Sequence, residues 1–377
     1  MSNLCRFKVG LLALLLCSCT GKEDQNVTLV SPLDCRNTED IASRVSVIEP
    51  LCLVLPEEEH LASIQKVLID SNHDYIVMDS RKNVYKFSRE GKLISRIGRQ
   101  GRGPGEYAAL MDIALDRLGK NIFLLSLGQL TEFSETGEYI NTYPLPSINY
   151  DALAPSSSGF FLIVSAPNQR PEDLTQGHDL VHVYSLSEKK VISKFLKRNE
   201  HVINTDLVSY SYGQGYFLRP LEGENVLYYV SDDELEPCFK VDFGQQASPE
   251  HYALEGDQFD ISKFVMSPYY KMVSHYQRTS NVQYFSAIGP DAEIHHFVFN
   301  NDGSPLFSWV DKSFKIAPIY AVSSDESFFY FGVDDPQALF DLLEKEKDPM
   351  VRAIVGMTMG SDEISKDFPW LVKIAFN

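Results

Sequence analysis

The chain has 377 residues, and its 52 acidic side chains against 34 basic ones give a formal net charge of −18 at pH 7. A field of this sign repels nucleic acids and anionic lipids, so nucleic-acid binding is excluded unless a local basic patch overrides it. The six cysteines form no CxxC pair and no Cys/His metal spacing, which excludes a zinc ribbon and a thioredoxin-like redox motif.

The first 18 residues are predicted to be an export signal. Arg6 and Lys8 precede an apolar run from Val9 to Leu16, which is too short to span a bilayer as a helix. The next residues, Leu16-Cys17-Ser18-Cys19, resemble a bacterial lipobox, in which a small residue precedes the acylated cysteine. We therefore expect Cys19 to be lipidated and to become the mature N-terminus. The alternative is an ordinary secretory signal with an incidental cysteine.

Residues 19–40 are predicted to form a flexible tether between the lipid and the fold, because they are polar, acidic and weakly patterned. The stretch from Thr20 to Asp24 resembles the signal that sends Bacteroidetes lipoproteins to the outer face of the outer membrane. A periplasm-facing anchor is the alternative. With Cys19 acylated, the three thiols of Cys35, Cys52 and Cys238 leave room for at most one disulfide.

Residues 41–377 contain an internal repeat. The pattern F-S-x-x-G-x-x-I begins at Phe87 and again at Phe133, and a related F-x-x-x-G pattern begins at Phe299. Each copy follows an apolar strand and places a glycine where a tight hairpin turn needs a positive φ. Small antiparallel sheets that recur every 40 to 50 residues are typical of a β-propeller. The sequence thus predicts an all-β fold, a six-bladed β-propeller.

The six predicted blades follow one another along the chain, and the ends of the chain share the last one. A strand at Arg44–Ile48 or Leu51–Leu55 is expected to complete the sheet of the C-terminal strand Pro369–Phe376, because closure removes exposed sheet edges. The blades are expected at Ile64–Arg102, Gly103–Ser147, Ile148–Asn199, His201–Gln246, Tyr270–Trp309 and from Ile316 onward.

Two short helical insertions are predicted within the propeller. The first spans about residues 248–272 and follows Ser248-Pro249, a helix cap with proline at the first helical position. The second spans about residues 335–348, where Leu339, Leu342 and Leu343 give an amphipathic pattern. Both are expected to pack on the propeller, and the first could also help to form a pocket.

The stretch from Arg96 to Tyr107, RIGRQGRGPGEY, carries four glycines and is followed by the strand-like run Leu110–Leu115. A dinucleotide fingerprint needs a helix after its glycines, and no P-loop motif occurs, so we interpret the stretch as a crossover between blades. That crossover would bring four side chains near one mouth of the central channel, where arginine forks and an aromatic face suit carboxylates or sugars. These ligand-binding candidates are Arg99, Arg102, Glu106 and Tyr107.

A second group of candidates comes from a loop-like segment with three tyrosines, Tyr210, Tyr212 and Tyr216. Most aromatic residues of a propeller form the cores of its blades. In this segment glycine and serine separate the rings, so the rings could instead stack against a glycan or a peptide.

Together, the export signal, the lipobox, the F-x-x-x-G repeats and the stretch Ile97–Tyr107 resemble the six-bladed β-propeller lipoproteins of Bacteroidetes, which are similar in shape to NHL-type propellers. The closing Pro369-Trp-Leu-Val-Lys-Ile is similar to the last strand of that family. The resemblance implies a fold and a location at the cell envelope, but no activity.

The sequence therefore predicts a lipid-anchored, non-catalytic and monomeric propeller of the outer membrane, facing the cell surface or the periplasm. We expect it to bind a glycan, a peptide or a partner protein, and no nucleic acid. The alternative is a hydrolase or lyase that depends on a divalent cation, as in other NHL-type propellers. The residues indicate no cofactor, while the NHL resemblance leaves calcium in the channel open. No catalytic residue is assigned.

Overall fold

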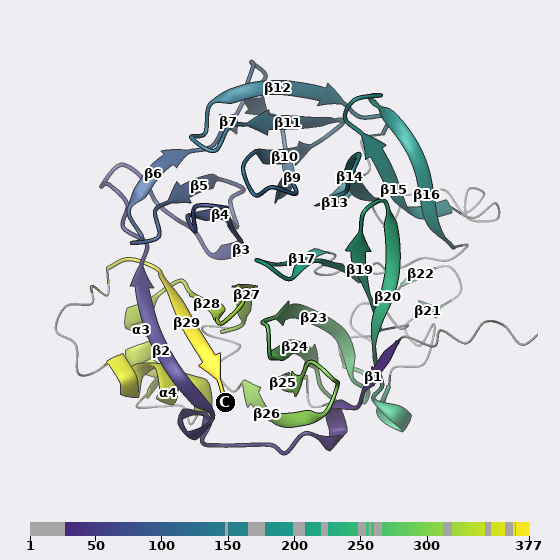
Figure 1. The fold of residues 1–377 in the computed structure, drawn as a ribbon. Helices are drawn as coiled ribbons and strands as arrows, with labels where there is room; N and C mark the ends of the chain where they lie inside the picture. The colour runs from purple at the N-terminus through teal and green to yellow at the C-terminus, as the bar shows by residue number, and fades with distance from the viewer. Residues whose placement is uncertain are drawn as a thin grey trace, which may run out of the picture.

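The computed structural model describes most of the chain, namely residues 27–147, 150–164, 178–198, 208–219, 225–247, 254–255, 258–259, 266–290, 292–311, 319–343, 348–358, 365 and 367–377. Cys19 and the predicted export signal lie outside the described residues. Within the described residues the fold is all-β and propeller-like, with small antiparallel sheets arranged in a ring (Figure 1).

Four of the sheets have four antiparallel strands each, joined in chain order. The first consists of β3 (Ile64–Ile69), β4 (Tyr75–Asp79), β5 (Val84–Phe87) and β6 (Leu93–Arg96). The second consists of β9 (Leu110–Leu115), β10 (Ile122–Ser126), β11 (Gln129–Phe133) and β12 (Tyr139–Pro144). The third consists of β13 (Tyr150–Pro155), β14 (Gly159–Val164), β15 (His178–Ser185) and β16 (Lys190–Arg198). The fourth consists of β23 (Lys271–Arg278), β24 (Val282–Ile288), β25 (Ile294–Asn300) and β26 (Pro305–Asp311).

A nine-stranded sheet completes the ring, so the six separate sheets expected from the sequence are not all separate. One half contains β17 (Val208–Ser211), β18 (Gly215–Leu218), β19 (Val226–Ser231) and β20 (Glu234–Val241), with β1 (Thr28–Val30) at its edge. The other half contains β27 (Ala321–Ser324), β28 (Phe329–Val333), β29 (Trp370–Phe376) and β2 (Val45–Cys52). One pair of residues, Ser211 and Ser324, joins the two halves through β17 and β27.

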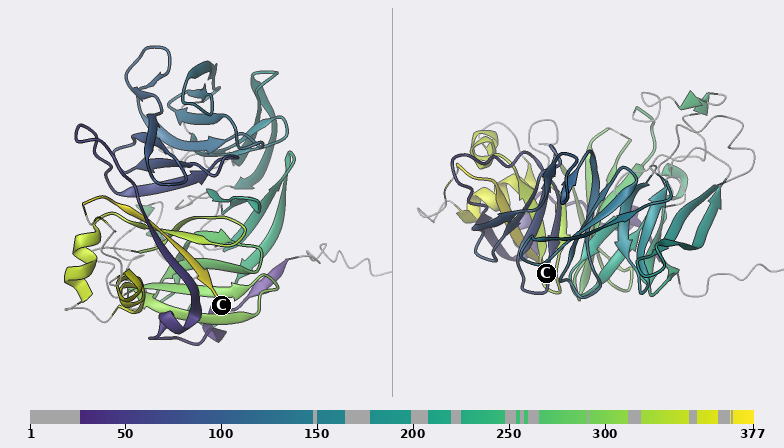
Figure 2. Two further views of the ribbon diagram at one scale, coloured as in Figure 1. Left: turned by 60° about the vertical axis from the view of Figure 1, so that its left-hand side comes forward. Right: turned by 90° about the horizontal axis from the view of Figure 1, so that it is seen from above.

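The first strand of each four-stranded sheet lies towards the centre of the ring, and so do β17 and β27 of the nine-stranded sheet. Figure 1 shows β3, β9, β13, β17, β23 and β27 around the axis, and β6, β12, β16, β20, β26 and β2 at the rim. Seen edge-on in Figure 2, the sheets stand side by side, as blades do. The faces of neighbouring sheets bury the core between them, and Trp309, Trp370 and Tyr284 are among its largest fully buried side chains.

The turn glycines of the repeat have the predicted conformation. Gly91, Gly137 and Gly303 have φ values of +80°, +87° and +87°. Space as well as conformation selects glycine here, because a Cβ on Gly137 would lie 2.6 Å from Cδ1 of Ile97, and one on Gly303 would lie 2.6 Å from Cγ2 of Thr28. The prediction from the F-x-x-x-G spacing is therefore confirmed at all three positions.

The two ends of the chain share one sheet, as predicted. Strand β2 pairs antiparallel with β29, from Val45 with Phe376 to Cys52 with Trp370, and the register shifts once between Val45 and Val47. Strand β29 also pairs with β28, so the N-terminal strand is the outermost strand of the C-terminal sheet.

The predicted tether is wrong for its later residues. Strand β1 pairs in parallel with β20, and Val30, which lies opposite Val241, is 1% exposed because it belongs to the same core cluster as Phe239. The chain then passes along the outside of β26, where Asn37 forms a bridge with Ser308, and reaches β2 through two short 3-10 helices, η1 (Pro32–Asp34) and η2 (Ile41–Arg44). Val30 and Ile41 are apolar anchors in an otherwise polar stretch, and they hold it on the fold.

The helix predicted at about 248–272 is wrong where the structure describes that segment. Strands β21 (Leu254–Glu255) and β22 (Gln258–Phe259) pair with each other, and β23 begins at Lys271. The dipeptide between β21 and β22, Gly-Asp, favours a two-residue hairpin connection over a helix. A further 3-10 helix, η3 (Gly244–Gln246), follows β20.

The second helical insertion is confirmed and is longer than predicted. Helix α3 (Pro336–Leu343) begins where expected, and a second helix, α4 (Pro349–Thr358), follows it. Asp348 caps α4 by accepting hydrogen bonds from the backbone of Met350 and Val351. Val351 and Ile354 of α4 are fully buried and belong to the same core cluster as Trp370 of β29.

Candidate functional site

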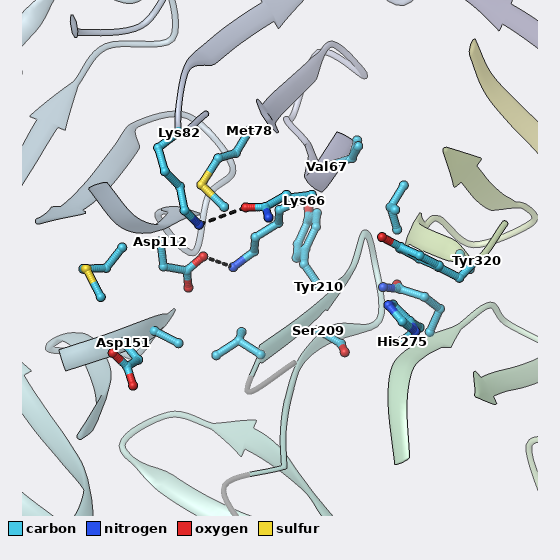
Figure 3. A pocket seen from close by; sticks show the side chains of 17 residues that line it. Lys66, Val67, Met78, Lys82, Asp112, Asp151, Ser209, Tyr210, His275 and Tyr320 are labelled. Atoms are coloured by element: carbon cyan, nitrogen blue, oxygen red, sulfur yellow. Dashed lines mark hydrogen bonds and ion pairs between the residues drawn. The ribbon is translucent and has the colours of Figure 1, made fainter. Parts of the chain in front are cut away.

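The innermost strands enclose a cavity of about 430 Å³ at one end of the channel (Figure 3). Every innermost strand supplies part of its wall, and Lys82 adds to it from the turn after β4. We call this space the channel cavity. Its polar wall residues include Gln65, Lys66, Lys82, Asp112, Asp151, Ser209, His275, Gln277 and Tyr320.

A lysine and an aspartate from neighbouring sheets form an ion pair in the wall. Nζ of Lys66 lies 2.7 Å from Oδ1 of Asp112, and the two side chains are 13% and 8% exposed. Oδ2 of Asp112 accepts a hydrogen bond from the backbone N–H of Leu153 at 3.0 Å. Asp112 thus ties β3, β9 and β13 together, and its charge is already matched by Lys66.

Lys82 brings a second ammonium group to the same side of the cavity. Its backbone adopts φ of +64°, which turns the residue out of the strand path, and its Nζ donates to Oε1 of Gln65 at 2.9 Å. Burial lowers the pKa of Lys82 from its usual 10.5, and the charge of Lys66 lowers it further, against the opposing effect of Asp112. The ammonium group of Lys82 is therefore held by the neutral amide of Gln65, and the neighbouring ammonium group of Lys66 is already paired with Asp112.

An aromatic pair forms the opposite wall (Figure 3). The rings of His275 and Tyr320 stack with their centroids 3.8 Å apart and an interplanar angle of 23°. The pairing of β23 with β24 is irregular around Ser274, and His275 has φ of +53°. Such a bulge redirects a side chain. Nδ1 of His275 lies 2.8 Å from Oγ of Ser286, which fixes the ring beneath Tyr320.

The crossover candidates do not line the channel cavity, although they follow β6 at the same end of the ring. Two short strands, β7 (Arg99–Gln100) and β8 (Glu106–Tyr107), pair in parallel here. Nε of Arg99 donates to Oε1 of Glu106 at 2.8 Å, and the Arg99 side chain is 75% exposed. Tyr107 is 3% exposed, and its hydroxyl donates to the backbone carbonyl of Lys82 at 2.8 Å. Tyr107 is therefore not part of the cavity wall itself, but its hydrogen bond holds the backbone of the wall residue Lys82.

The glycine-rich loop of this crossover is a cradle for its own carboxylate. The backbone N–H groups of Arg102 and Gly103 donate to Oε2 of Glu106 at 2.9 and 2.8 Å. These hydrogen bonds, with that from Arg99, lower the pKa of Glu106. The glycine-rich loop therefore does bind an anion, as its sequence suggests, but this anion is the carboxylate of Glu106 in the same chain.

The three tyrosine candidates lie together near the other end of the channel. The rings of Tyr210 and Tyr216 are 4.8 Å apart, and those of Tyr210 and Tyr212 are 6.4 Å apart. Tyr210 and Tyr216 are 8% and 7% exposed, and burial raises the pKa of both hydroxyls. Tyr210 lines the channel cavity on one side and a second cavity on the other.

Lys66 and Asp112 were not singled out from the sequence, although a signal was present. They are 46 residues apart, which is also the spacing of Phe87 and Phe133 in the repeat. They therefore occupy equivalent positions on the first strands of two successive sheets. A charged residue at this position of a mostly apolar first strand indicates that its side chain belongs to the channel wall.

Within the segments that the structure describes, no group of three or more His, Cys, Asp or Glu side chains could hold a metal ion. No helix in those segments is long and apolar enough to cross a membrane.

The sequence matches a family model over residues 57–358, described as "Domain of unknown function (DUF4934)". The chain belongs to this family. The match spans every four-stranded sheet of this DUF4934 member, both cavities and helices α3 and α4. No match was found among curated proteins.

Two solved structures from Bacteroides are similar to this DUF4934 chain in fold. One is a Bacteroides fragilis NCTC 9343 protein with the description "putative exported protein", at 15% identity and a TM-score of 0.74, over 93% of this chain and 100% of that one. The other is a DUF4221 family member from Bacteroides vulgatus ATCC 8482, at 14% identity and a TM-score of 0.52, over 88% and 97%. At these identities the likeness concerns the fold.

Proposed function

We propose that this chain is an exported, lipid-anchored propeller of the cell envelope that binds a small anionic ligand in the channel cavity without catalysing a reaction. The ligand is a carboxylate, carried either by an acidic sugar or by a peptide. The observation that carries this proposal is Lys82, a partly buried ammonium group that faces the cavity beside Lys66 and has an amide as its hydrogen-bond partner.

The propeller in this proposal has six blades. The nine-stranded sheet divides at the single pair Ser211 and Ser324 into two units, each with four strands in the order of a blade. Counting these with the four separate sheets gives six units around the axis. The edge strand β1 is then a fifth strand added to one blade.

Export and anchoring rest on the N-terminal sequence. The apolar run Val9–Leu16 and the cysteine at position 19 match a lipoprotein signal, and the B. fragilis structure of similar fold carries an "exported" description. Strand β1 begins at Thr28, so the residues between Cys19 and Val27 are the tether in this proposal. The anchor lies in the outer membrane, and the lysine and acidic residues after Cys19 favour its outer face.

The wall of the cavity favours an anion that also has an apolar or ring-shaped part. Two ammonium groups, of Lys66 and Lys82, and two carboxylates, of Asp112 and Asp151, line the cavity. Asp112 pairs with Lys66, whereas Lys82 is held by the amide of Gln65, so a ligand carboxylate placed at Lys82 would form an ion pair there. The stacked pair His275 and Tyr320 lies across the cavity from both lysines (Figure 3). It offers a flat face to a sugar ring or an aromatic side chain. A volume of about 430 Å³ is within the range of small-molecule sites.

The test is a thermal-shift and calorimetric screen of the full chain in detergent against sugar acids, neutral sugars, and short peptides with and without acidic groups. A ligand at a hundred times its Kd stabilises the fold by about 2.7 kcal/mol. We expect a carboxylate ligand to bind and to lose about tenfold or more in affinity in Lys82→Gln. The matched control is Lys92→Gln, an exposed lysine outside the cavity.

The sugar-acid and acidic-peptide arms of the screen distinguish the two sources of the carboxylate. Longer members of each series test Arg99 and Arg102, which are exposed at the same end of the ring and could contact a ligand that extends from the cavity. Binding should also weaken at high pH, as Lys82 loses its proton below the usual pKa of 10.5. Equal affinity of Lys82→Gln and the unaltered chain for every hit would refute the proposed site.

A further inference from the structure

A second cavity of about 420 Å³ lies near the other end of the innermost strands. The channel cavity is lined by residues near the start of β9 and β17, such as Asp112 and Ser209, whereas this one is lined by residues after their ends, such as Leu118 and Tyr212. Tyr210 belongs to both walls, and its hydroxyl is held by the backbone carbonyl of Ile69 at 2.8 Å. Tyr210 therefore separates the two spaces, and we call the second one the tyrosine cavity.

Two tyrosines of the tyrosine cavity have hydroxyls that make no hydrogen bond to any described residue. Tyr212 and Tyr229 are both partly buried. The ring of Tyr212 contacts the rings of His73 and Tyr210, and the ring of Tyr229 contacts that of Phe217. In contrast, the hydroxyls of Tyr210 and Tyr216 donate to backbone carbonyls. The cavity thus combines ring surface with hydroxyl groups that are not committed to the fold.

Glycines keep this wall open. Gly213 and Gly215 have φ values of +76° and +94°. A Cβ on Gly215 would lie 2.7 Å from the ring of Tyr229, and one on Gly213 would lie 2.9 Å from the side chain of Glu326. Glycine at both positions lets the Tyr229 ring and the Glu326 carboxylate approach the backbone of the β17–β18 turn, where they line the cavity.

The charges of the tyrosine cavity differ from those of the channel cavity. Three carboxylates, from Asp116, Asp232 and Glu326, face one guanidinium, that of Arg117. Arg117 pairs with Asp232 at 2.6 Å, and both side chains are largely exposed. Oδ1 of Asp116 accepts hydrogen bonds from the backbone of Leu118 and Lys120, whereas the Glu326 carboxylate makes no hydrogen bond within the described part of the chain. The excess of carboxylates disfavours anions.

We infer that the tyrosine cavity is a second binding site, for a neutral saccharide. The apolar faces of a sugar ring pack on aromatic rings, and its hydroxyl groups donate to carboxylates and exchange hydrogen bonds with tyrosine hydroxyls. Tyr212 and Tyr229 supply the rings, Glu326 supplies an acceptor, and Arg117 supplies a donor to ring or glycosidic oxygens. The site is independent of the channel cavity, because Tyr210 lies between them.

The experiment is isothermal titration of the full chain in detergent with neutral oligosaccharides of glucose, mannose and xylose, and separately with a sugar acid and a polyamine. A neutral oligosaccharide should bind, and Tyr212→Ala should weaken it about tenfold. Glu326→Ala, at an exposed position where misfolding is not expected, should weaken it by a similar factor. Tyr139→Ala, at a 43% exposed tyrosine on β12, is the matched control and should leave the affinity unchanged.

The two sites are distinguished by testing each variant with the ligand of the other site. Lys82→Gln should leave saccharide binding unchanged, and Tyr212→Ala should leave binding of the carboxylate ligand unchanged, so either site can fail without the other. The inference is overturned if no neutral oligosaccharide binds, or if Tyr212→Ala and Glu326→Ala bind as tightly as the unaltered chain. It is also overturned if the polyamine alone binds, because the cavity would then select a cation.

Discussion

The carboxylate of Glu106 lies directly over Gly101, so that a Cβ at position 101 would collide with Oε2 of Glu106. The same oxygen accepts the backbone N–H groups of Arg102 and Gly103. A glycine-rich loop that looks suited to a phosphate is therefore closed by a glutamate five residues further along the chain. The loop and its anion are one structural unit.

This relationship predicts a non-additive pair of substitutions. Gly101→Ala should destabilise the fold by about 1–3 kcal/mol, because the new methyl group displaces the carboxylate from its donors. In a Glu106→Ala background the same change should cost much less, because the three atoms nearest to the new methyl group all belong to the Glu106 carboxyl group and are then absent. Urea denaturation of the four proteins of this cycle measures the coupling. Equal costs in both backgrounds would contradict the steric account.

The buried cation of the first sheet should contribute strongly to stability. Nζ of Lys86 lies 2.7 Å from Oδ2 of Asp70 and donates to the backbone carbonyl of Glu135 in the turn between β11 and β12. The side chains of Lys86 and Asp70 are 4% and 1% exposed. Lys86→Met should cost about 3–5 kcal/mol, because Asp70 would remain buried without its cation.

The control for this prediction is Lys92→Met. Lys92 is exposed in the turn between β5 and β6, and its loss should change the free energy of unfolding by less than about 0.5 kcal/mol. Chemical denaturation of both variants makes the comparison. If Lys86→Met proved as mild as Lys92→Met, the ion pair would not be a main contributor.

A histidine of the third sheet should make stability depend on pH. Burial lowers the pKa of His182 from 6.5 to about 4, with a smaller effect from the charge of Lys194. Nδ1 of His182 lies 3.0 Å from the hydroxyl of Tyr150. Because the unfolded chain binds the proton more tightly, this contribution is complete above pH 6.5 and is lost as the pH falls towards 4.

Over that window one proton accounts for at most about 1.4 kcal/mol of stability per pH unit. His182→Asn keeps a hydrogen-bonding group near Tyr150 and removes the titration. The difference in free energy of unfolding between the unaltered chain and His182→Asn should therefore shrink as the pH falls from 7 to 4, in a series of urea titrations. A constant difference would show that His182 is not the titrating group.

The stability of the sheet that joins the two ends of the chain should depend on β29, which lies between β28 and β2. Ile374 of β29 is fully buried between Phe329 of β28 and Ile48 of β2. Ile374→Ala should cost about 2–5 kcal/mol. Ile94→Ala, at a 48% exposed isoleucine on β6, should cost less than about 1 kcal/mol by the same urea assay. Similar costs at the two positions would mean that the closing sheet is not tightly packed.

Local signals were enough to predict the repeating part of the fold. The positive φ of Gly91, Gly137 and Gly303 and the pairing of β2 with β29 follow from turn chemistry and from the need to cover sheet edges. At about 248–272 the cap signal Ser248-Pro249 predicts a helix, whereas the structure pairs β21 with β22 there, a hairpin that the Gly-Asp dipeptide favours. The packed part of the predicted tether was missed because only a few apolar residues hold it.

The candidate sites were harder to predict, because they depend on which side chains the ring brings together. Tyr210, Tyr212 and Tyr216 were selected as a group, and they do lie together. Arg99 and Glu106 were selected for a ligand, but the structure pairs them with each other. Lys82 enters the channel cavity through a left-handed backbone conformation in a turn, which residue type alone does not reveal.

The sharing of one sheet by β2 and β29 also constrains when the protein can fold. The ribosome makes β2 long before β29, so the ring stays open, with β28 and β2 both lacking their partner, until β29 has been made. Pairing of such distant segments is slow, because a long loop must close before the contacts form. A chain cut short before Trp370 retains two unpaired strand edges, which makes incomplete products prone to aggregation or degradation.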